Sequence, residues 1–397
     1  MSNQPDYETG VIGLGLIGSA VVRYLAAAGA TVAGIGPAEP VDWSNHRGAF
    51  ASHYDSGRIT RKLDIQLEWA ILAVRSMAQY PILEAASGLT FHRPAGTMFI
   101  DPDPQAAAQR AAVGRSVGAT FAVDPPSAYR GPKEVTPPSA ATVTREPAPA
   151  GHIDPRVMGV AQRKVAAGHG AELVEAEVVS IERVPGGFRL GGSNDRSVHV
   201  GQVVVAAGAF TAEIHPALAG LALRPRAETV VLAELGAGEQ ARLAGLPAVL
   251  AGLEGGRYQD LYLVPPTGYP DGSVQLKLGA TLAERAWLPT AGGRRAWMSG
   301  DAHAGDLPAL RDLLLGVIPD VTAENWTTKP CLITDTPTRL PFIGEVDDGL
   351  FVAAGGNGFA GKSADAIGAV AARLVTEGGR WTDPDLAETA FRPTFTH

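Results

Sequence analysis

The spacing of apolar residues near the N-terminus predicts a strand, a helix and a second strand in close succession. In "TGVIGLGLIGSAVVRYLAAAGATVAGIG", Val11 and Ile12 end a short apolar run. Residues 21–26 then carry apolar side chains at helical spacing, Gly29 ends that helix, and residues 31–35 form a second apolar run. This order predicts a βαβ unit at the start of the chain.

Three glycines lie at the turn between the first strand and the helix. Gly13, Gly15 and Gly18 form a G-x-G-x-x-G pattern, which permits a tight turn, a close approach to a pyrophosphate and close helix packing. The helix N-terminus would face the phosphates with free N–H groups. In its βαβ context the pattern predicts dinucleotide binding. The acid expected to bind the ribose falls at Gly36, which leaves Glu39, or backbone and water, for that contact.

The next hundred residues show a mixed pattern. Residues 37–62 are polar and loop-like. A helix with one buried face follows, formed by Leu67, Ile71, Val74 and Met77. The stretch "FHRPAGTMFID" predicts a hairpin strand, and seven prolines between positions 125 and 149 indicate a boundary or an irregular crossing.

From Gly151 onward the pattern becomes regular again. A helix is predicted over residues 155–169, and residues 203–206 have the composition of a fully buried strand. Residues 216–324 contain several strand candidates and a helix near 307–316. The strand "GLFVAAGG", a glycine turn and a helix over about 363–376 end the pattern.

Bulk composition narrows the classes of partner. The 397 residues suggest roughly two domains, and an apolar content of 45% allows a large core. A formal charge of −8, with no basic cluster, argues against nucleic acid or an anionic membrane as partner. The polar start "MSNQPDYETG" lacks signal-peptide character, and no apolar run reaches membrane-spanning length. The histidines lack the spacing of a metal site.

Cys331 is the only cysteine, so it cannot form an internal disulfide. A single thiol suits a reducing cytoplasm. Most free cysteines are small buried hydrophobes, which leaves two interpretations of Cys331: core packing, or attachment of a ligand.

Five motifs in order give the chain a family resemblance. They are "VIGLGLIG", "SHYDSGRITR", "VVVAAGAF", "KLG" and "CLITDTPTRLPFIG…AAGGNGFAG". With these motifs the chain resembles the D-amino-acid-oxidase superfamily of flavoproteins, and within it the monomeric sarcosine oxidase and N-methyltryptophan oxidase branch. The resemblance covers nearly the whole chain.

The resemblance implies an α/β fold with two domains. An FAD-binding, Rossmann-like domain of the glutathione-reductase type would consist of residues 1–85, 150–217 and 325–397. An inserted α+β substrate domain with an antiparallel sheet would consist of residues 86–149 and 218–324.

The same resemblance implies a role for Cys331. In this branch the 8α-methyl of FAD is attached to a cysteine within K-x-C-x-x-T-x-T-P, and Lys329, Thr334, Thr336 and Pro337 occupy the other positions here. Cys331 is therefore expected to carry a covalent 8α-S-cysteinyl FAD.

Three charged residues would carry the chemistry. Pairs such as Arg58 and Arg61 are usually solvated, but the family places the first beside the flavin and the second on the substrate carboxylate, a contact that suits a guanidinium. Lys277, in "VQLKLGA", would face solvent in an ordinary strand. The family instead places a lysine there over the flavin, where its charge promotes electron transfer to oxygen.

The chain departs from the branch at the substrate clamp. Ala360 stands where the branch has a carboxylate-binding lysine, and Lys362 follows two residues later. Thr281 replaces a histidine and Ile333 an aromatic residue. Sarcosine itself is therefore a poor expectation, and a larger or differently charged amine is favoured.

The remaining expected contacts surround the cofactor. Asn357, Gly358 and Phe359 precede the last long helix, whose N-terminus would face the flavin pyrimidine. His53 and Tyr54 precede the arginine pair; Tyr54 is expected near the substrate, and neither is assigned as a base. The expected FAD contacts are Gly13, Gly15, Leu16, Ile17, Gly18, Gly36, Ser52, His53, Arg58, Val178, Ala207, Gly208, Cys331, Gly356, Asn357, Gly358 and Phe359.

Taken with the resemblance, these features predict a cytoplasmic, monomeric FAD oxidase. It would oxidise a C–N bond of a secondary amine or of an N-substituted or cyclic amino acid, using molecular oxygen and giving an imine and hydrogen peroxide. The alternatives are a flavin dehydrogenase with another acceptor, a nicotinamide-dependent dehydrogenase, and a non-catalytic flavin-binding protein.

Overall fold

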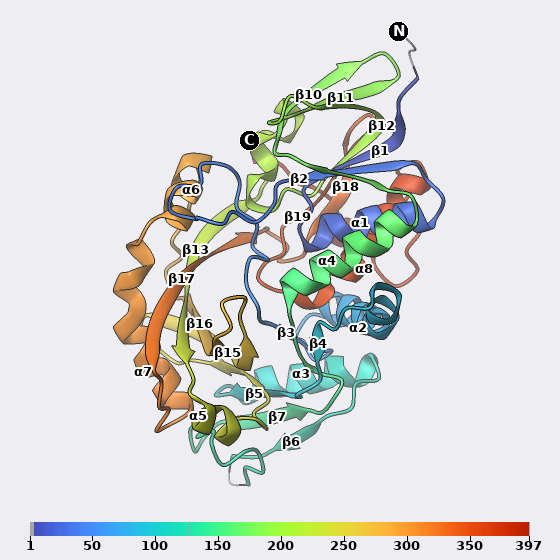
Figure 1. The fold of residues 1–397 in the computed structure, drawn as a ribbon. Coiled ribbons are helices and arrows are strands. Elements are labelled where there is room, and N and C mark those ends of the chain that lie inside the picture. The colour runs from blue at the N-terminus through green and yellow to red at the C-terminus, as the bar shows by residue number, and fades with distance from the viewer. Residues whose placement is uncertain (1–3, 127, 397) are drawn as a thin grey trace.

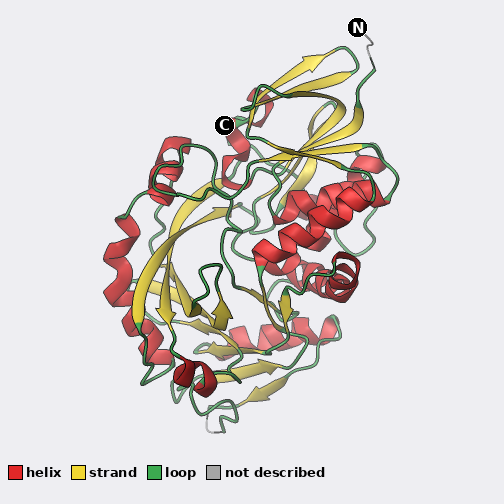
Figure 2. Ribbon diagram, viewed as in Figure 1, coloured by secondary structure: helices red, strands yellow, loops and turns green. Residues whose placement is uncertain are grey.

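Two eight-stranded sheets and a small three-stranded sheet organise the chain (Figures 1 and 2). The computed structural model describes residues 4–126 and 128–396. The first large sheet contains β1 (Tyr7–Ile12), β2 (Val32–Gly36), β9 (Glu172–Glu175), β10 (Val178–Val184), β11 (Gly187–Gly192), β12 (Ser197–Val205), β18 (Phe342–Asp347) and β19 (Leu350–Ala354).

Parallel strands form the centre of this first sheet. β1 lies between β12 and β2 and is parallel to both, and β19 is parallel to β12. Four helices pack together beside it: α1 (Leu16–Ala27), α2 (Leu67–Ser87), α4 (Pro155–Gly168) and α8 (Ala360–Thr376) (Figure 1). Val11, Val21, Val22 and Leu25 are fully buried among them. The predicted βαβ unit is confirmed.

The second large sheet is antiparallel except where β14 runs parallel to β5. Its strands are β5 (Thr97–Asp101), β6 (Ala122–Asp124), β7 (Thr142–Glu146), β13 (Arg224–Glu234), β14 (Ala248–Gly252), β15 (Tyr258–Gly268), β16 (Val274–Leu282) and β17 (Asn325–Asp335). On its outer side lie α5 (Ala237–Arg242), α6 (Ala291–Ser299) and α7 (Leu307–Val317), whereas α3 (Pro104–Ser116) lies between β5 and β7 and the helix α2 (Figure 1). The expected fold class, an α/β nucleotide-binding layer joined to an antiparallel substrate layer, is confirmed.

Short elements complete the fold. The small sheet orders β3 (Arg58–Thr60), β8 (Gly151–Ile153) and β4 (His92–Arg93). Three 3-10 turns span Gly208–Glu213, Pro216–Leu218 and Ala302–Asp306, and α9 (Glu388–Phe391) lies near the C-terminus. Within the described residues, no helix has both the length and the hydropathy for crossing a bilayer.

The hairpin predicted for residues 91–101 is wrong. β4 pairs with β8 in the small sheet, whereas β5 pairs with β7 and β14 in the second large sheet. The backbone turns at Gly96, whose φ of +80° suits a residue without a side chain. The two apolar runs therefore leave this turn for different sheets.

The buried face of α2 also differs from the expectation. Of the four residues predicted to be buried, only Met77 is; Leu67 is 43% exposed, and Ile71 and Val74 are partly buried. The buried stripe is centred on Trp69, whose Nε1 donates to the carbonyl of Arg339 at 2.8 Å. Packing against α8 and α4, rather than the apolar pattern of the helix itself, sets its orientation.

β17 joins the two layers. It pairs along its whole length with β13 of the second sheet, although residues 325–397 were expected within the FAD-binding domain. The expected boundary at residue 325 thus falls at the start of a strand of the substrate layer. The domain division otherwise remains a prediction.

Candidate FAD and substrate site

One large cavity of about 1120 Å³ lies between the two layers. This volume slightly exceeds the usual range of roughly 300–1,000 Å³ for a single ligand pocket. Most of the expected site residues line it: Gly13, Gly15, Leu16, Ile17, Gly36, Ser52, His53, Tyr54, Arg58, Arg61, Val178, Ala207, Gly208, Cys331, Gly356, Asn357, Gly358, Phe359, Ala360 and Lys362. Gly18 and Lys277 are not among the described residues that line it.

The glycine turn at one end of the cavity has no room for side chains. Gly13 has a φ of +99°, and a Cβ at Gly18 would lie 1.8 Å from the carbonyl oxygen of Gly13. Gly15 caps α1 without a side-chain hydrogen bond. The first N–H groups of the helix thus face an open cradle, which suits a pyrophosphate.

Gly36 explains the missing ribose acid. A Cβ at this position would lie 2.6 Å from the backbone nitrogen of Leu14, so the turn and β2 approach too closely for an acidic side chain. Glu39 does not reach back, because Arg156 binds it with two contacts of 2.6 and 2.7 Å. Glu177, which sequence reasoning missed, lines the cavity.

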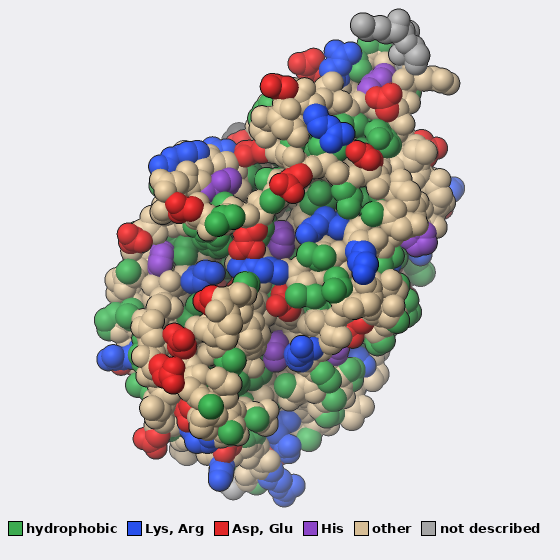
Figure 3. Space-filling view, viewed as in Figure 1, with side chains coloured by type: hydrophobic (Ala, Val, Ile, Leu, Met, Phe, Trp, Pro, Cys, Tyr) green, Lys and Arg blue, Asp and Glu red, His purple; other side chains and the backbone are tan. Residues whose placement is uncertain are grey.

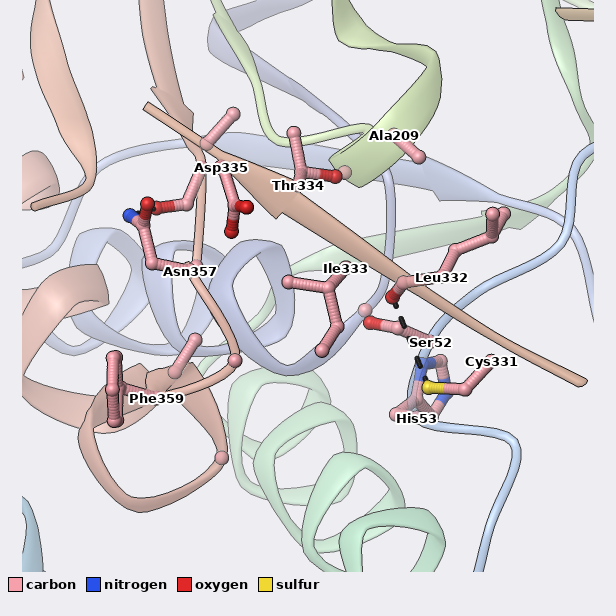
Figure 4. A pocket seen from close by; sticks show the side chains of 18 of the residues that line it. Ser52, His53, Ala209, Cys331, Leu332, Ile333, Thr334, Asp335, Asn357 and Phe359 are labelled. Atoms are coloured by element: carbon pink, nitrogen blue, oxygen red, sulfur yellow. Dashed lines mark hydrogen bonds between the residues drawn. The ribbon is translucent and has the colours of Figure 1, made fainter. Parts of the chain in front are cut away.

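Cys331 faces the cavity from β17. Figure 4 shows its thiol beside Ser52 and His53, with Ile333 and Asp335 further along the same strand. The sulfur lies 3.9 Å from Nη2 of Arg58. Burial raises the pKa of the thiol, and Arg58 only partly opposes this effect. Cys331 therefore does not pack inside the hydrophobic core; its thiol lies in the wall of the cavity.

A tight turn leads into α8 opposite Cys331. Asn357 has a φ of +50°, and its Oδ1 accepts from the backbone nitrogen of Thr336 at 2.8 Å. α8 begins at Ala360, three residues earlier than predicted, and Phe359 caps it without a side-chain hydrogen bond. Lys362 therefore lies in the first helical turn rather than in the loop before it. The free N-terminus of α8 opens on the cavity.

His53 and Tyr54 lie at the cavity wall but lack the features of a base. Burial, with Arg163 and Arg156 nearby, lowers the pKa of His53 to about 3, which leaves a neutral ring at neutral pH. The hydroxyl of Tyr54 donates to the carbonyl of Ala38 at 3.1 Å, away from the arginine pair.

The Asp55 group consists of Asp55, Arg58 and Lys277. The carboxylate of Asp55 binds Arg58, accepts from Nζ of Lys277 at 2.7 Å and accepts from the hydroxyl of Tyr269 at 2.8 Å. Lys277 is 1% exposed, so it does not face solvent, and it also donates to the carbonyl of Gly57. Burial would raise the pKa of Asp55, but the two cations hold it well below the usual range. Lys277 is thus bound to protein groups rather than presented to the cavity.

The Asp64 group consists of Asp64, Arg61 and Lys362. Asp64 lies 3.0 Å from Nζ of Lys362 and 3.4 Å from Nη2 of Arg61. Arg61 is 5% exposed and its Nε has no hydrogen-bond partner. Although burial would raise it, the cations lower the pKa of Asp64 to about 2. With two cations and one anion, the Asp64 group carries a net positive charge, and the buried Nε of Arg61 has no acceptor.

The concave face of the second sheet carries charges that sequence reasoning missed. Arg226 donates to Asp335 at 2.9 Å and to Glu228 at 2.5 Å. Asp260 and Arg285 line the same part of the cavity. Alternation along β13 could have placed Arg226 and Glu228 on one face, but no motif marked that face as the wall of a cavity.

The surface charges and the possible metal ligands add little to this description of the site. Lys and Arg side chains are interspersed with Asp and Glu on the face shown in Figure 3. Over residues 4–126 and 128–396, no group of three His, Cys, Asp or Glu residues is placed to hold a metal ion.

Solved structures share this fold over nearly the whole chain. NikD, an unusual amino acid oxidase, matches with a TM-score of 0.77 at 19% identity, over 98% of each chain. Glycine oxidase from Geobacillus kaustophilus matches with a TM-score of 0.71 at 22% identity, over 95% of this chain and 96% of that one. L-proline dehydrogenase from P. horikoshii matches with a TM-score of 0.69 at 19% identity, over 95% of both. No curated protein matches in sequence.

A family model described as FAD dependent oxidoreductase (DAO) matches residues 8–374. The glycine cradle, the two uncapped helix N-termini and the thiol in the cavity wall all suit FAD. The chain therefore belongs to the DAO family of FAD-dependent oxidoreductases.

Proposed function

We propose that this protein oxidises a C–N bond of a secondary amine or of an N-substituted or cyclic amino acid, with FAD attached through its 8α carbon to Cys331. The products would be an imine, which water hydrolyses, and hydrogen peroxide formed from oxygen. FAD, when bound, supplies the acceptor for the hydride equivalent that leaves the carbon next to the nitrogen.

The observation that carries this proposal is the free donor of Arg61. A buried guanidinium normally has its N–H groups paired, because an unpaired buried donor costs roughly 1–3 kcal/mol. Nε of Arg61 has no partner, and the side chain lines the cavity. The planar fork of a guanidinium suits a carboxylate. Nε itself is closed off from the cavity, so a substrate carboxylate would meet the outer nitrogens of the guanidinium and draw the side chain toward the cavity, where Nε could share the same acceptor.

The neighbouring residues would orient such a substrate. Lys362 adds positive charge beside Arg61 through their shared partner Asp64, while Ala360 presents only a methyl group to the cavity. Ile333 offers an apolar wall on β17 (Figure 4). A carboxylate held at one side and an apolar wall at the other would present the carbon–nitrogen bond to the cofactor.

A second candidate is a flavin dehydrogenase that uses an acceptor other than oxygen. The placement of Lys277 favours it, because Asp55 and Gly57 bind the ammonium group that an oxidase would direct at oxygen. The similar folds include oxidases and a dehydrogenase, so likeness of fold does not separate the two.

The test is a screen of N-methyl amino acids, cyclic imino acids and larger secondary amines. Anaerobic bleaching of the flavin reports oxidation of the substrate, and peroxide release in air reports oxygen as acceptor. Bleaching with fast peroxide release supports the oxidase. Bleaching followed by slow reoxidation supports the dehydrogenase, and no bleaching by any amine contradicts both.

Lys277→Met sharpens this choice. In an oxidase the variant should keep anaerobic reduction within about tenfold of wild type and slow reoxidation by at least ~100-fold, the effect of losing one well-placed charge (about 2.7 kcal/mol). Equal slowing of both half-reactions would show that Lys277 only supports the fold.

The attachment of FAD has its own test. Acid-precipitated, washed protein should stay yellow and carry the mass of FAD on the peptide that contains Cys331. Cys331→Ser should release its flavin on denaturation. Free flavin in the wild-type supernatant would rule out the covalent bond.

A further inference from the structure

Glu228 occupies a central position in the cavity wall. It lies on β13 directly opposite Cys331 of β17, and residues directly opposite in an antiparallel pair project from the same face, with Cβ atoms about 4.5–5.5 Å apart. Glu228 is 3% exposed and lines the cavity. If Cys331 holds the flavin, Glu228 stands next to the attachment point.

One oxygen of this buried carboxylate is unused. Oε2 accepts from Arg226 at 2.5 Å and from the hydroxyl of Thr281 at 3.4 Å. Among the described residues, none donates a hydrogen bond to Oε1. A buried carboxylate is stable only when it is paired and hydrogen-bonded, so this oxygen calls for a donor from the contents of the cavity.

The charges around Glu228 leave its carboxylate only partly paired. Arg226 is shared between Glu228 and Asp335, and Asp260 and Arg285 line the adjoining wall. Arg224 also lines this wall and lies opposite Asp335 in the strand register, so three carboxylates face three guanidiniums. Glu228 has no cation to itself, because Arg226 is divided between two carboxylates and Arg58 is bound to Asp55. In the Asp64 group, by contrast, two cations share one carboxylate.

An aromatic ring lies near Glu228. A Cβ at Gly279 would lie 2.5 Å from the ring of Tyr262, so the glycine leaves space for that ring. Tyr262 lines the cavity, and Glu228 is close enough to contribute to its raised pKa, which burial mainly causes. A carboxylate beside an aromatic ring is a favourable surrounding for an organic cation.

We infer that the substrate carries a second, positively charged nitrogen group, which binds Glu228 while the substrate carboxylate binds Arg61. This inference rests on the proposed function, and it narrows the substrate class to N-substituted or cyclic amino acids with a basic side chain. The inference also agrees with Ala360 at the position of the expected lysine. The cavity would bind a carboxylate of the substrate at Arg61 and a cation of the substrate at Glu228, and would not hold one small acid between two cations.

The test uses two substrates of equal size on the flavin-loaded enzyme: Nα-methylornithine, which is cationic, and Nα-methylnorleucine, which is neutral. Rates of anaerobic flavin reduction give kcat/KM for each. A charge-assisted contact should favour the cationic substrate in the wild type by about ten- to a hundredfold. Glu228→Gln, which keeps the shape and removes the charge, should bring this ratio to near one, and the ratio is the readout because it cancels any loss common to both substrates.

The other outcomes contradict the inference in different ways. Equal rates for the two substrates in the wild type would overturn it, and this comparison needs no variant, so it holds even if Glu228→Gln does not fold. Equal losses for both substrates in Glu228→Gln would make Glu228 structural. If other secondary amino acids bleach the flavin and these two do not, the inferred positive group on the substrate is wrong, while the proposed function stands. Failure of every secondary amine would instead remove the proposed function and the inference together.

Discussion

The Asp55 group and the Asp64 group contain the same kinds of residue, but they differ in whether all their hydrogen-bonding groups are paired. Each contains a buried aspartate, an arginine three positions away and a lysine from a distant part of the chain. In the Asp55 group the aspartate also binds Tyr269 and the backbone nitrogen of Ser56. Asp64 likewise accepts from the backbone nitrogens of Ile65 and Gln66, but its arginine contact is long, at 3.4 Å, and Nε of that arginine is unpaired.

Under the proposed function, the difference separates a supporting network from a binding site. A network whose donors and acceptors are paired stabilises the fold and has nothing to offer a ligand. A network with a buried, unused donor beside a cavity still has an interaction to offer a ligand. Composition alone does not distinguish them, since both hold two cations and one carboxylate.

The largest expected effect is on stability at the Asp55 group. Asp55→Asn removes the counter-ion of two cations, one of them, Lys277, 1% exposed. Breaking a buried ion pair on one side costs about 3–5 kcal/mol. The free energy of unfolding, measured by denaturant titration, should fall by that amount.

Asp64→Asn is the matched control for this loss. It should also destabilise, but added carboxylate ions should restore part of its stability, because Arg61 and Lys362 face the cavity. Equal rescue of both variants by carboxylate would contradict the distinction between the two groups.

The next effect is on substrate binding at Arg61. Arg61→Ala should weaken binding of an acid substrate by about ten- to a hundredfold, the effect of a charge-assisted fork worth roughly 1.5–3 kcal/mol. Arg61→Lys should recover only part, because an ammonium lacks the planar fork. The amide of the same substrate should be affected far less.

Lys362→Ala is the comparison here, because Lys362 already donates to Asp64 and to the carbonyl of Trp69. Its loss should weaken acid binding less than the loss of Arg61. If Arg61→Ala treats acid and amide as the wild type does, no carboxylate binds there, and only an amine oxidase remains.

The smallest effect is on pH dependence. Burial lowers the pKa of Lys362 to about 8, and Asp64 only partly opposes this. The ammonium form exists below this pKa, so its attraction for a carboxylate is present at pH 7 and is lost as the pH rises through about 8.

The Kd of acetate, followed by the flavin spectrum, should therefore rise above about pH 8, by less than roughly tenfold, since one pKa unit corresponds to about 1.4 kcal/mol. Lys362→Met should show no such rise. A persisting rise in that variant would assign the titration to Lys277, whose pKa is also lowered to about 8 by burial.

Several elements were predictable because their signals are local. The glycine turn follows from three glycines within six residues, and the strands of residues 216–324 follow from their apolar patterns, although their antiparallel pairing was implied only by the family resemblance. Elements whose orientation depends on distant partners were predicted less well. The face of α2 and the pairing of β4 and β5 are set by α8, β8 and β14, which lie elsewhere in the chain.

The sequence by itself determined the family, the nucleotide-binding turn and the single thiol available for a cofactor, because each depends on residue types at short, fixed spacing. Only the tertiary structure decided which charges are satisfied. Asp55 meets Lys277 across 222 positions, Asp64 meets Lys362 across 298, and Glu228 faces Cys331 through strand register. Ion pairing and burial depend on distances in space, and those distances exist only once the two layers have closed around the cavity.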